Sequence, residues 1–250
     1  MRADARVPSV EDMTTAPVAI VTGASRGLGF ALADALAGAG YRLIIDAREP
    51  VALETAAAEL ASRHGWRVTA IPGDIADPAH RAALRAAAAE LGGATLLVNN
   101  AGTLGANPLP ALADYPADQL LAALEVNVVA PIALTQQLLP DLRRRGGAVL
   151  NITSDAAVEP YTGWGGYGAA KAALEQASNV LAAEESVIRV WWVDPGDLRT
   201  RMHQEAFPGE DISDRPLPQT VTPAFLRLVG ERMPSGRYRA ADLQPAGAAA

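Results

Sequence analysis

Short apolar runs alternate along the chain with longer segments rich in helix-forming residues. The apolar runs cover residues 18–22, 42–46, 67–71, 95–98, 148–153, 187–193 and, more weakly, 237–241. Runs this short, without polar alternation, are typical of strands buried on both faces of a parallel sheet. The longer segments are often alanine-rich and are predicted to be helices at 27–39, 51–63, 78–91, 117–143, 165–183 and 222–232.

The alternation of strand and helix predicts the fold class. It favours an α/β, single-domain, doubly wound Rossmann fold, with a mostly parallel seven-stranded sheet flanked by helices and joined by right-handed crossovers. We expect this domain to span residues 17–244, after a disordered extension at 1–16 and before a flexible tail at 245–250. A proline-rich, charged segment at about 196–220 is expected to be a substrate loop that orders on binding.

Composition narrows the range of partners. Half of the 250 residues are hydrophobic, which suits a globular domain with a sizeable core. A net charge of −7 argues against nucleic acid and anionic membranes as partners, so a small-molecule ligand is expected. No apolar stretch reaches the ~18 residues of a membrane span and no signal-peptide pattern is visible, so we expect a cytoplasmic protein.

The sequence contains no pattern that indicates thiol or metal chemistry. The chain has no cysteine, which excludes disulfides, thiol catalysis and cysteine-ligated zinc. Its histidines, His64, His80 and His203, are scattered and show no metal-ligand spacing, so no metal site is expected. His203 is predicted to be a surface residue.

A glycine-rich turn follows the first predicted strand and opens the first predicted helix. Its sequence, Thr-Gly-Ala-Ser-Arg-Gly-Leu-Gly, occupies residues 22–29. Glycines permit a tight turn and let a pyrophosphate approach the free N–H groups at a helix N-terminus. The turn predicts a dinucleotide site that includes Gly23, Ser25, Arg26, Gly27, Leu28 and Gly29.

The end of the second predicted strand carries an acid and a base that favour different cofactors. Asp46 is suited to the ribose hydroxyls of NAD, whereas Arg48 is suited to the extra phosphate of NADP. Arg26 in the glycine turn is a second cation for that phosphate. Two cations against one carboxylate favour NADP(H), and NAD(H) stays open as the alternative.

Tyr167 and Lys171 are four residues apart on a predicted helix, and Ser154 follows the preceding strand. Residues four apart lie on one helix face, so the spacing predicts a phenol beside an ammonium. A nearby positive charge favours the phenolate and lowers the pKa of a tyrosine from about 10. A tyrosine tuned in this way exchanges a proton with an alcohol or carbonyl oxygen.

Together with further landmarks, in the same order, these residues resemble the short-chain dehydrogenase/reductase family over about residues 18–243. The further matches are Asp74 and Ile75 after the third strand, Asn100, Ala101 and Gly102 after the fourth, Asn127 in the long helix, and Pro195, Gly196, Leu198 and Thr200 after the sixth. The resemblance implies that Asn127, Ser154, Tyr167 and Lys171 are the catalytic residues. The other matched residues are then cofactor contacts, as Tyr167 and Lys171 also are.

A narrower resemblance is to the sepiapterin reductase and benzil reductase branch, which depends on NADP. It is carried by Gly163-Trp164 before Tyr167, by Glu184-Glu185 and by Ser235-Gly236-Arg237. In sepiapterin reductase an aspartate near the C-terminus anchors the pterin. Asp242 is the nearest candidate, but its spacing from Ser235-Gly236 does not match.

The family resemblance implies an NADP(H)-dependent oxidoreductase that moves a hydride between nicotinamide and a carbonyl or secondary alcohol. Tyr167 would be the general acid or base, Lys171 would lower its pKa and hold the nicotinamide ribose, and Ser154 would position the substrate oxygen. Pro131 lacks an N–H and leaves the Asn127 carbonyl without its helical donor. That carbonyl either holds a water of a proton relay, or the proline is a tolerated kink.

The segments flanking the nicotinamide carry Tyr161, Trp164, Met202 and Phe207, which are the candidate substrate contacts. An aromatic wall suits a flat or hydrophobic carbonyl compound. Alternatively, Trp164 and Phe207 pack in the core or at a subunit contact.

Two other functions stay open, namely an NAD-dependent alcohol dehydrogenase of the same family and a non-catalytic dinucleotide-binding sensor. Family members usually pair through the helices at 117–143 and 165–183, which implies a homodimer or a homotetramer.

Overall fold

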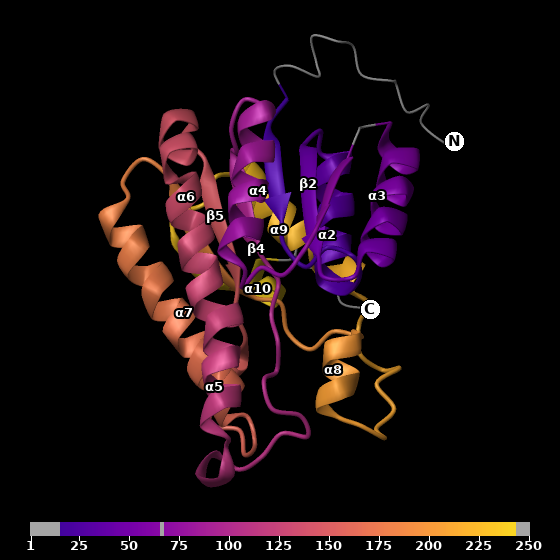
Figure 1. The fold of residues 1–250 in the computed structure, drawn as a ribbon, viewed down its shortest axis with the longest axis vertical. Coiled ribbons are helices and arrows are strands. Elements are labelled where there is room, and N and C mark those ends of the chain that lie inside the picture. Colours follow the sequence, from indigo (N-terminus) through magenta and orange to yellow (C-terminus); the bar gives the residue numbers. More distant parts are fainter. Residues whose placement is uncertain (1–15, 66–67, 244–250) are drawn as a thin grey trace.

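A computed structural model of the chain describes residues 16–65 and 68–243 (Figure 1). Apart from Ala16, the disordered extension expected at 1–16 lies outside these residues, and so does the tail expected at 245–250. Within them, seven parallel strands form one sheet in the order β3-β2-β1-β4-β5-β6-β7. Their bounds are Val18–Val21 (β1), Arg42–Ala47 (β2), Val68–Pro72 (β3), Leu96–Asn99 (β4), Ala148–Ile152 (β5), Arg189–Asp194 (β6) and Gly236–Arg239 (β7).

The expected fold class is confirmed, and every strand pair is parallel rather than most of them. Successive residues of a strand point to opposite faces, so a strand covered on both faces has no polar alternation. In β1, Val18 and Ile20 enter one core while Ala19 and Val21 enter the other, and all four are fully buried.

Helices cover both faces of the sheet. On one face lie α2 (Gly27–Gly38), α3 (Pro50–His64), α9 (Thr222–Gly230) and α10 (Ala240–Leu243), which contribute to the same core as Ala19 and Val21. On the other lie α4 (Pro78–Glu90), α6 (Ala130–Arg145) and the C-terminal half of α7 (Gly165–Glu184). Figure 1 shows α6 and α7 side by side, away from α2 and α3.

The helix predicted at 117–143 is not one regular helix. It consists of α5 (Ala117–Leu124), a π-helical turn η2 (Glu125–Val129) and α6. The N–H of Ala130 bonds to the carbonyl of Glu125, one residue further back than in an α-helix. Pro131, which has no N–H to donate, follows directly at the start of α6.

The segment predicted as a loop at about 196–220 contains regular structure. It holds a short helix α8 (Arg201–Ala206) and a 3₁₀ turn η4 (Pro218–Val221). Arg199 ties it together, because its N–H donates to the carbonyl of Pro216 (2.8 Å) and its Nε to the carbonyl of Arg215 (3.2 Å). The segment therefore contains a short helix and a 3₁₀ turn where the sequence suggested only a loop.

The strand order reverses direction at β1, which lies between β2 and β4. In an open parallel sheet, such a switch point leaves a crevice outside the carboxyl ends of the strands. In Figure 1, α5 and α8 extend beyond that edge on either side. All the loops that carry the predicted site residues start from this edge.

One helical stretch of the described residues, Ala117–Arg145, is long and apolar enough to cross a membrane by length and composition alone. This is weak evidence, because a helix packed on a sheet passes the same test. Leu134, Leu138 and Leu142 of this stretch are fully buried against the sheet. Its exposed residues include the apolar Leu121 (68%) and Val129 (45%) as well as Asp118, Gln136 and Arg143.

Candidate cofactor and substrate site

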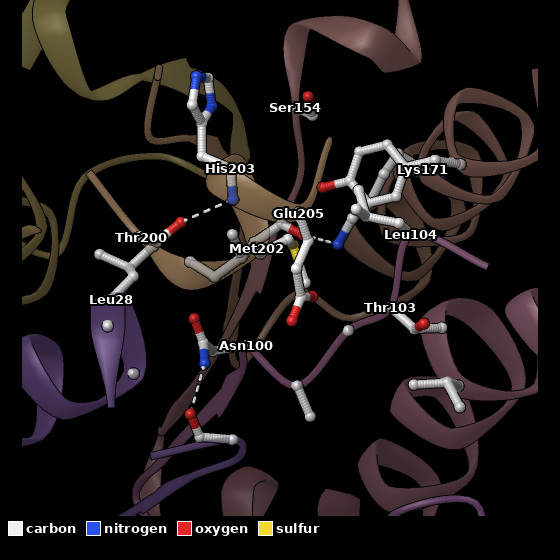
Figure 2. Close-up of a pocket in the computed structure, with 18 of the residues that line it drawn as sticks. Leu28, Asn100, Thr103, Leu104, Ser154, Lys171, Thr200, Met202, His203 and Glu205 are labelled. Atoms are coloured by element: carbon white, nitrogen blue, oxygen red, sulfur yellow. Dashed lines mark hydrogen bonds between the residues drawn. The ribbon is translucent and has the colours of Figure 1, made fainter. Parts of the chain in front are cut away.

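A cavity of about 1130 Å³ opens at the carboxyl edge of the sheet. With the exception of Asn127, it is lined by every residue that the sequence analysis assigned to catalysis, cofactor or substrate. Figure 2 shows side chains from widely separated segments, among them Leu28, Asn100, Ser154, Lys171 and Met202, around this common space. Residues that sequence reasoning did not single out for the site also line it, including Thr103, Leu104, Gln119, Asp155, Thr162, Asp194 and Glu205.

The glycine loop after β1 is fastened to the loop after β4. The Asn100 side-chain amide donates to the carbonyls of Thr22 (2.9 Å) and Gly23 (3.2 Å). In return, the Thr22 hydroxyl oxygen accepts from the N–H groups of Asn100 and Ala101, both at 3.0 Å. Gly23 has a φ of +65° and Gly27 a φ of +59°, which glycine adopts without strain. The loop conformation is thus fixed by its own neighbours.

The N-terminus of α2 at the end of this loop fits an anion. No side chain caps it, and its first turn contains no acidic residue. Its first N–H groups are therefore left for a ligand, and the helix dipole favours a negative charge there. Arg26 at the N-cap and Arg48 after β2 are both exposed, line the cavity, and take part in no ion pair within the described residues. This donor set suits the pyrophosphate and a further phosphate of a dinucleotide.

Asp46 faces inward rather than toward solvent, with 1% of its surface exposed. One carboxylate oxygen accepts from the Gly23 N–H at 2.7 Å, and the other lies 3.0 Å from Nε2 of His80. His80 is itself buried. The carboxylate that the sequence offered for ribose hydroxyls therefore supports the glycine loop from behind.

Tyr167 and Lys171 both project from α7 into the buried end of the cavity, 8% and 4% exposed. The Lys171 Nζ donates to the carbonyl of Ile152 at 2.8 Å and lies 5.5 Å from the centre of the Tyr167 ring. Burial lowers the pKa of Lys171 to about 8.

The pKa of Tyr167 is raised above its ordinary value of 10.0, contrary to what the Tyr-x-x-x-Lys spacing predicted. Burial is the main cause, the charges of Asp155 and Asp194 add to it, and a hydrogen bond with Ser154 partly offsets it. The expected lowering is not found, because burial of the phenol has the largest effect on its pKa. Near neutral pH, Tyr167 is a neutral phenol.

Ser154 stands at the end of β5, with its hydroxyl in a small hydrogen-bond network. The hydroxyl donates to Oδ1 of Asp155 (2.9 Å) and accepts from the N–H of Ala156 (3.1 Å). The other oxygen of Asp155 accepts from the Tyr161 hydroxyl at 2.9 Å. Sequence reasoning missed Asp155, and its position directly after Ser154 was the only available signal.

Asn127 is fully buried in the π-helical turn and does not reach the cavity. Its amide nitrogen donates to the carbonyls of Thr103 and Ala123, both at 2.9 Å, and its oxygen accepts from the Thr103 N–H at 3.2 Å. A Cβ on Gly102 would lie 2.9 Å from that oxygen. The side chain thus anchors the loop after β4 against η2.

A cluster of aromatic side chains forms the wall of the cavity beside Tyr167. The Trp164 ring lies 5.6 Å from the Tyr167 ring and 5.8 Å from that of Phe207, which in turn lies 4.9 Å from His203. The side chain of His203 is only 11% exposed, so its prediction as a surface residue is wrong. In Figure 2, His203 and Met202, both of α8, lie to the left of Lys171.

Comparison with known proteins shows a single family. Residues 17–211 match the short chain dehydrogenase family. The oxidoreductase claN of Passalora fulva is 35% identical over 84% of this chain and 95% of its own length. The sepiapterin reductase of Xenopus laevis is 34% identical over 87% of this chain and 83% of its own. A short chain dehydrogenase of Escherichia coli CFT073, solved with NADPH, superposes with a TM-score of 0.83 at 28% identity, covering 95% of this chain and 100% of that one.

We predict that Gly29→Ala destroys the cofactor loop without unfolding the protein. An added Cβ would lie 2.4 Å from the carbonyl oxygen of Gly23 and 2.4 Å from the Asn100 amide, so the loop must move. Affinity for NADPH, measured by fluorescence titration, should fall at least about tenfold, the scale of one lost charged hydrogen bond.

The control is Gly230→Ala on α9, where nothing lies within 4 Å of the added Cβ. It should bind cofactor as the parent protein does. Equal affinity of the Gly29→Ala protein and the parent would contradict the close packing of this loop.

Proposed function

The chain belongs to the short-chain dehydrogenase family and is an NAD(P)-dependent oxidoreductase, and on that premise we propose that it uses NADPH to reduce the carbonyl group of a hydrophobic, ring-bearing compound. The observation that carries the proposal is the buried Tyr167 phenol, which lines the same cavity as Ser154 and packs against the Trp164 ring. A carbonyl reduction consumes one hydride and one proton. A protonated phenol at this point is suited to supply the proton.

In the proposed reaction, the substrate oxygen binds beside the Tyr167 hydroxyl, and Oη of Tyr167 gives it a proton. The bound reduced nicotinamide supplies the hydride. Ser154 keeps the phenol in place, and Trp164 and Phe207 exclude water from around the carbonyl. Holding the acid and the substrate at hydrogen-bond distance accounts for most of the gain that such an acid can give.

Lys171 is proposed to hold the nicotinamide ribose. Its ammonium donates to the carbonyl of Ile152, which leaves further N–H groups for other acceptors. The pKa of about 8 keeps a large share of Lys171 charged at neutral pH. The charge therefore remains available to a sugar hydroxyl and to a phenolate that forms when Tyr167 gives up its proton.

The proposed preference for NADP(H) is supported by the carboxylate of Asp46 and by the side chains of Arg26 and Arg48. Both oxygens of Asp46 are already engaged, with Gly23 and His80, so they are not offered to ribose hydroxyls. Arg26 and Arg48 remain exposed in the cavity, where a phosphate on the ribose would pair with them. The similar Escherichia coli protein was solved with NADPH.

The substrate class follows from the wall of the cavity. Besides Trp164 and Phe207, the lining next to Tyr167 includes Leu104, Ala156 and Met202. Such a surface favours a flat, apolar carbonyl compound over a small hydrophilic one. Asp242 on α10 does not line the cavity, so a pterin anchored by this residue is not part of the proposal.

We further propose that the protein is a homodimer that pairs through α5, η2 and α7. Leu121 is 68%, Val129 45% and Val180 44% exposed, and the three lie on neighbouring helical segments. Grouped apolar side chains on a helical surface mark an association site. A second copy of the same surface would cover them through a two-fold axis.

Tyr167→Phe is predicted to reduce turnover at least ~100-fold, the usual scale of acid catalysis. The substitution removes only the hydroxyl, so the affinity for NADPH should stay within about twofold of the parent value. The control is Tyr238→Phe on β7, whose hydroxyl bonds to the carbonyl of Pro234 outside the cavity. It should keep full turnover, whereas unchanged turnover in Tyr167→Phe would rule out the assigned acid.

Arg48→Ala is predicted to weaken NADPH binding by about tenfold or more, because one charge-assisted contact to the phosphate is lost. NADH binding should not change, since NADH lacks that phosphate. Isothermal titration of both cofactors measures this, with Arg85→Ala on the exposed face of α4 as the control. An equal loss for NADH and NADPH would argue against the phosphate contact.

Leu121→Glu is predicted to convert the dimer into a monomer in sedimentation velocity, because it places a charge inside the apolar interface. Leu217→Glu is the control, since Leu217 is also exposed (49%) but lies in the segment before η4. A parent protein that sediments as a monomer would refute the dimer, and a Leu121→Glu protein that remains dimeric would refute this interface.

A further inference from the structure

His80 is buried behind the cofactor loop and does not line the cavity. It belongs to the first turn of α4, which begins at Pro78 after the N-cap residue Asp77. The Asp77 side chain accepts from the N–H of Ala79 at 2.8 Å, so the start of the helix is fixed. This first turn holds the His80 ring against the ends of β2 and β3.

Asp46 at the end of β2 faces α4 because of the alternation along its strand. Ile44, two residues earlier, packs in the same core as Leu84 of α4, and side chains two apart point to one face of a sheet. Oδ2 of Asp46 lies 3.0 Å from Nε2 of His80, and the two side chains are only 2% and 5% exposed. A carboxylate only accepts hydrogen bonds, so Nε2 of His80 is the donor.

The His80 ring occupies space that a side chain at position 73 would need. A Cβ on Gly73 would lie 2.2 Å from Nδ1 of His80 and 2.7 Å from its Cγ. The N–H of Gly73 donates to the carbonyl of Ala47 at 3.0 Å, which ties this turn to the end of β2. The glycine therefore lets the histidine ring reach Asp46.

His80 decides how well the Asp46 carboxylate is satisfied where it lies. Among the described residues, His80 is the only side chain within hydrogen-bond or ion-pair distance of it, and the Gly23 N–H is its other donor at 2.7 Å. Without His80, one oxygen of a buried carboxylate would lack a partner, which is unfavourable. Because Asp46 also lines the cavity, its side chain could turn toward that space instead.

The two orientations of Asp46 favour different dinucleotides. In the observed orientation, Arg26 and Arg48 have no acidic partner within the described part of the chain and remain for a phosphate. A carboxylate turned into the cavity would attract these cations and repel the extra phosphate of NADP. It would also offer its oxygens to the ribose hydroxyls of NAD.

We propose that His80 is a positioning residue that sets the cofactor preference, because it holds Asp46 away from the cavity and thereby favours NADP(H) over NAD(H). The inference rests on the proposed preference for NADP(H). It adds a residue that acts through Asp46 and does not contact the cofactor.

The test compares two substitutions of His80. His80→Leu keeps a side chain of similar bulk without a donor, whereas His80→Gln keeps an N–H group that can reach the position of Nε2. Dissociation constants for NADPH and NADH are measured by isothermal titration. In His80→Leu the preference for NADPH over NADH should fall at least about tenfold, mainly through weaker NADPH binding. In His80→Gln it should stay within about threefold of the parent value.

His64→Leu is the matched control, because Nε2 of His64 lies 2.8 Å from Oδ1 of Asp34 in a second histidine–aspartate pair that does not line the cavity. Its cofactor preference should equal that of the parent. Equal losses of NADPH and NADH affinity in His80→Leu would overturn the proposal, because His80 would then only support the loop. Unchanged affinities for both cofactors would overturn it too.

The double variant His80→Leu/Asp46→Asn tests whether Asp46 carries the effect. An amide oxygen still accepts from the Gly23 N–H, but the uncharged side chain does not repel a phosphate. The preference for NADPH should therefore return to within a few-fold of the parent value, and a preference that stays low would overturn the role of Asp46.

Gly73→Ala reaches the same contact from the other side, since its added methyl group displaces the His80 ring. It should shift the preference in the same direction as His80→Leu, and it takes the place of that variant if His80→Leu does not fold. A parent-like preference in Gly73→Ala would count against the proposal.

These measurements need no turnover, so they separate the inference from the proposed function. A parent protein that binds NADH as tightly as NADPH would contradict the proposed preference for NADP(H). Even then, a shift toward NADH in His80→Leu would support the role of His80, and an unchanged ratio would overturn it. A protein that reduces no carbonyl compound gives the same binding result.

Discussion

The junction between the loops after β1 and β4 is the interaction on which the rest of the site depends. Thr22 and Gly23 accept four hydrogen bonds from Asn100 and Ala101 across it, and Asp46 supports the same loop from behind through the Gly23 N–H. Because the two loops meet at the switch point of a parallel sheet, fixing them also fixes the N-terminus of α2 and the floor of the cavity. The cofactor end is therefore built before any ligand binds.

Burial then decides the chemistry at the other end of the cavity. It opposes charge on both catalytic groups, so it raises the pKa of Tyr167 and lowers that of Lys171 to about 8. The first effect keeps Tyr167 protonated near neutral pH. The charges of Asp155 and Asp194 also raise the pKa of Tyr167.

Much of this architecture could be predicted from the sequence, because it is carried by local patterns. Apolar runs without alternation predicted the parallel strands, and the glycine turn and the Tyr167–Lys171 spacing identified segments that the fold brings to one cavity. The orientation of Asp46 could not be predicted, since a carboxylate at a strand end faces in or out according to partners, here His80, that are distant in sequence. Nor could the sequence predict the position of Asp155, the direction in which the pKa of Tyr167 shifts, or the π-helical turn that buries Asn127.

The most direct measurement follows the hydride itself. The protein is incubated with NADPH carrying deuterium on the transferring carbon of the nicotinamide and with a panel of aromatic ketones, diketones, quinones, pterins and aliphatic ketones. Mass spectrometry then locates the label in the products. The account predicts deuterium on the carbinol carbon of an aromatic or hydrophobic product. Tight binding of NADPH without a labelled alcohol from any member of the panel would contradict it.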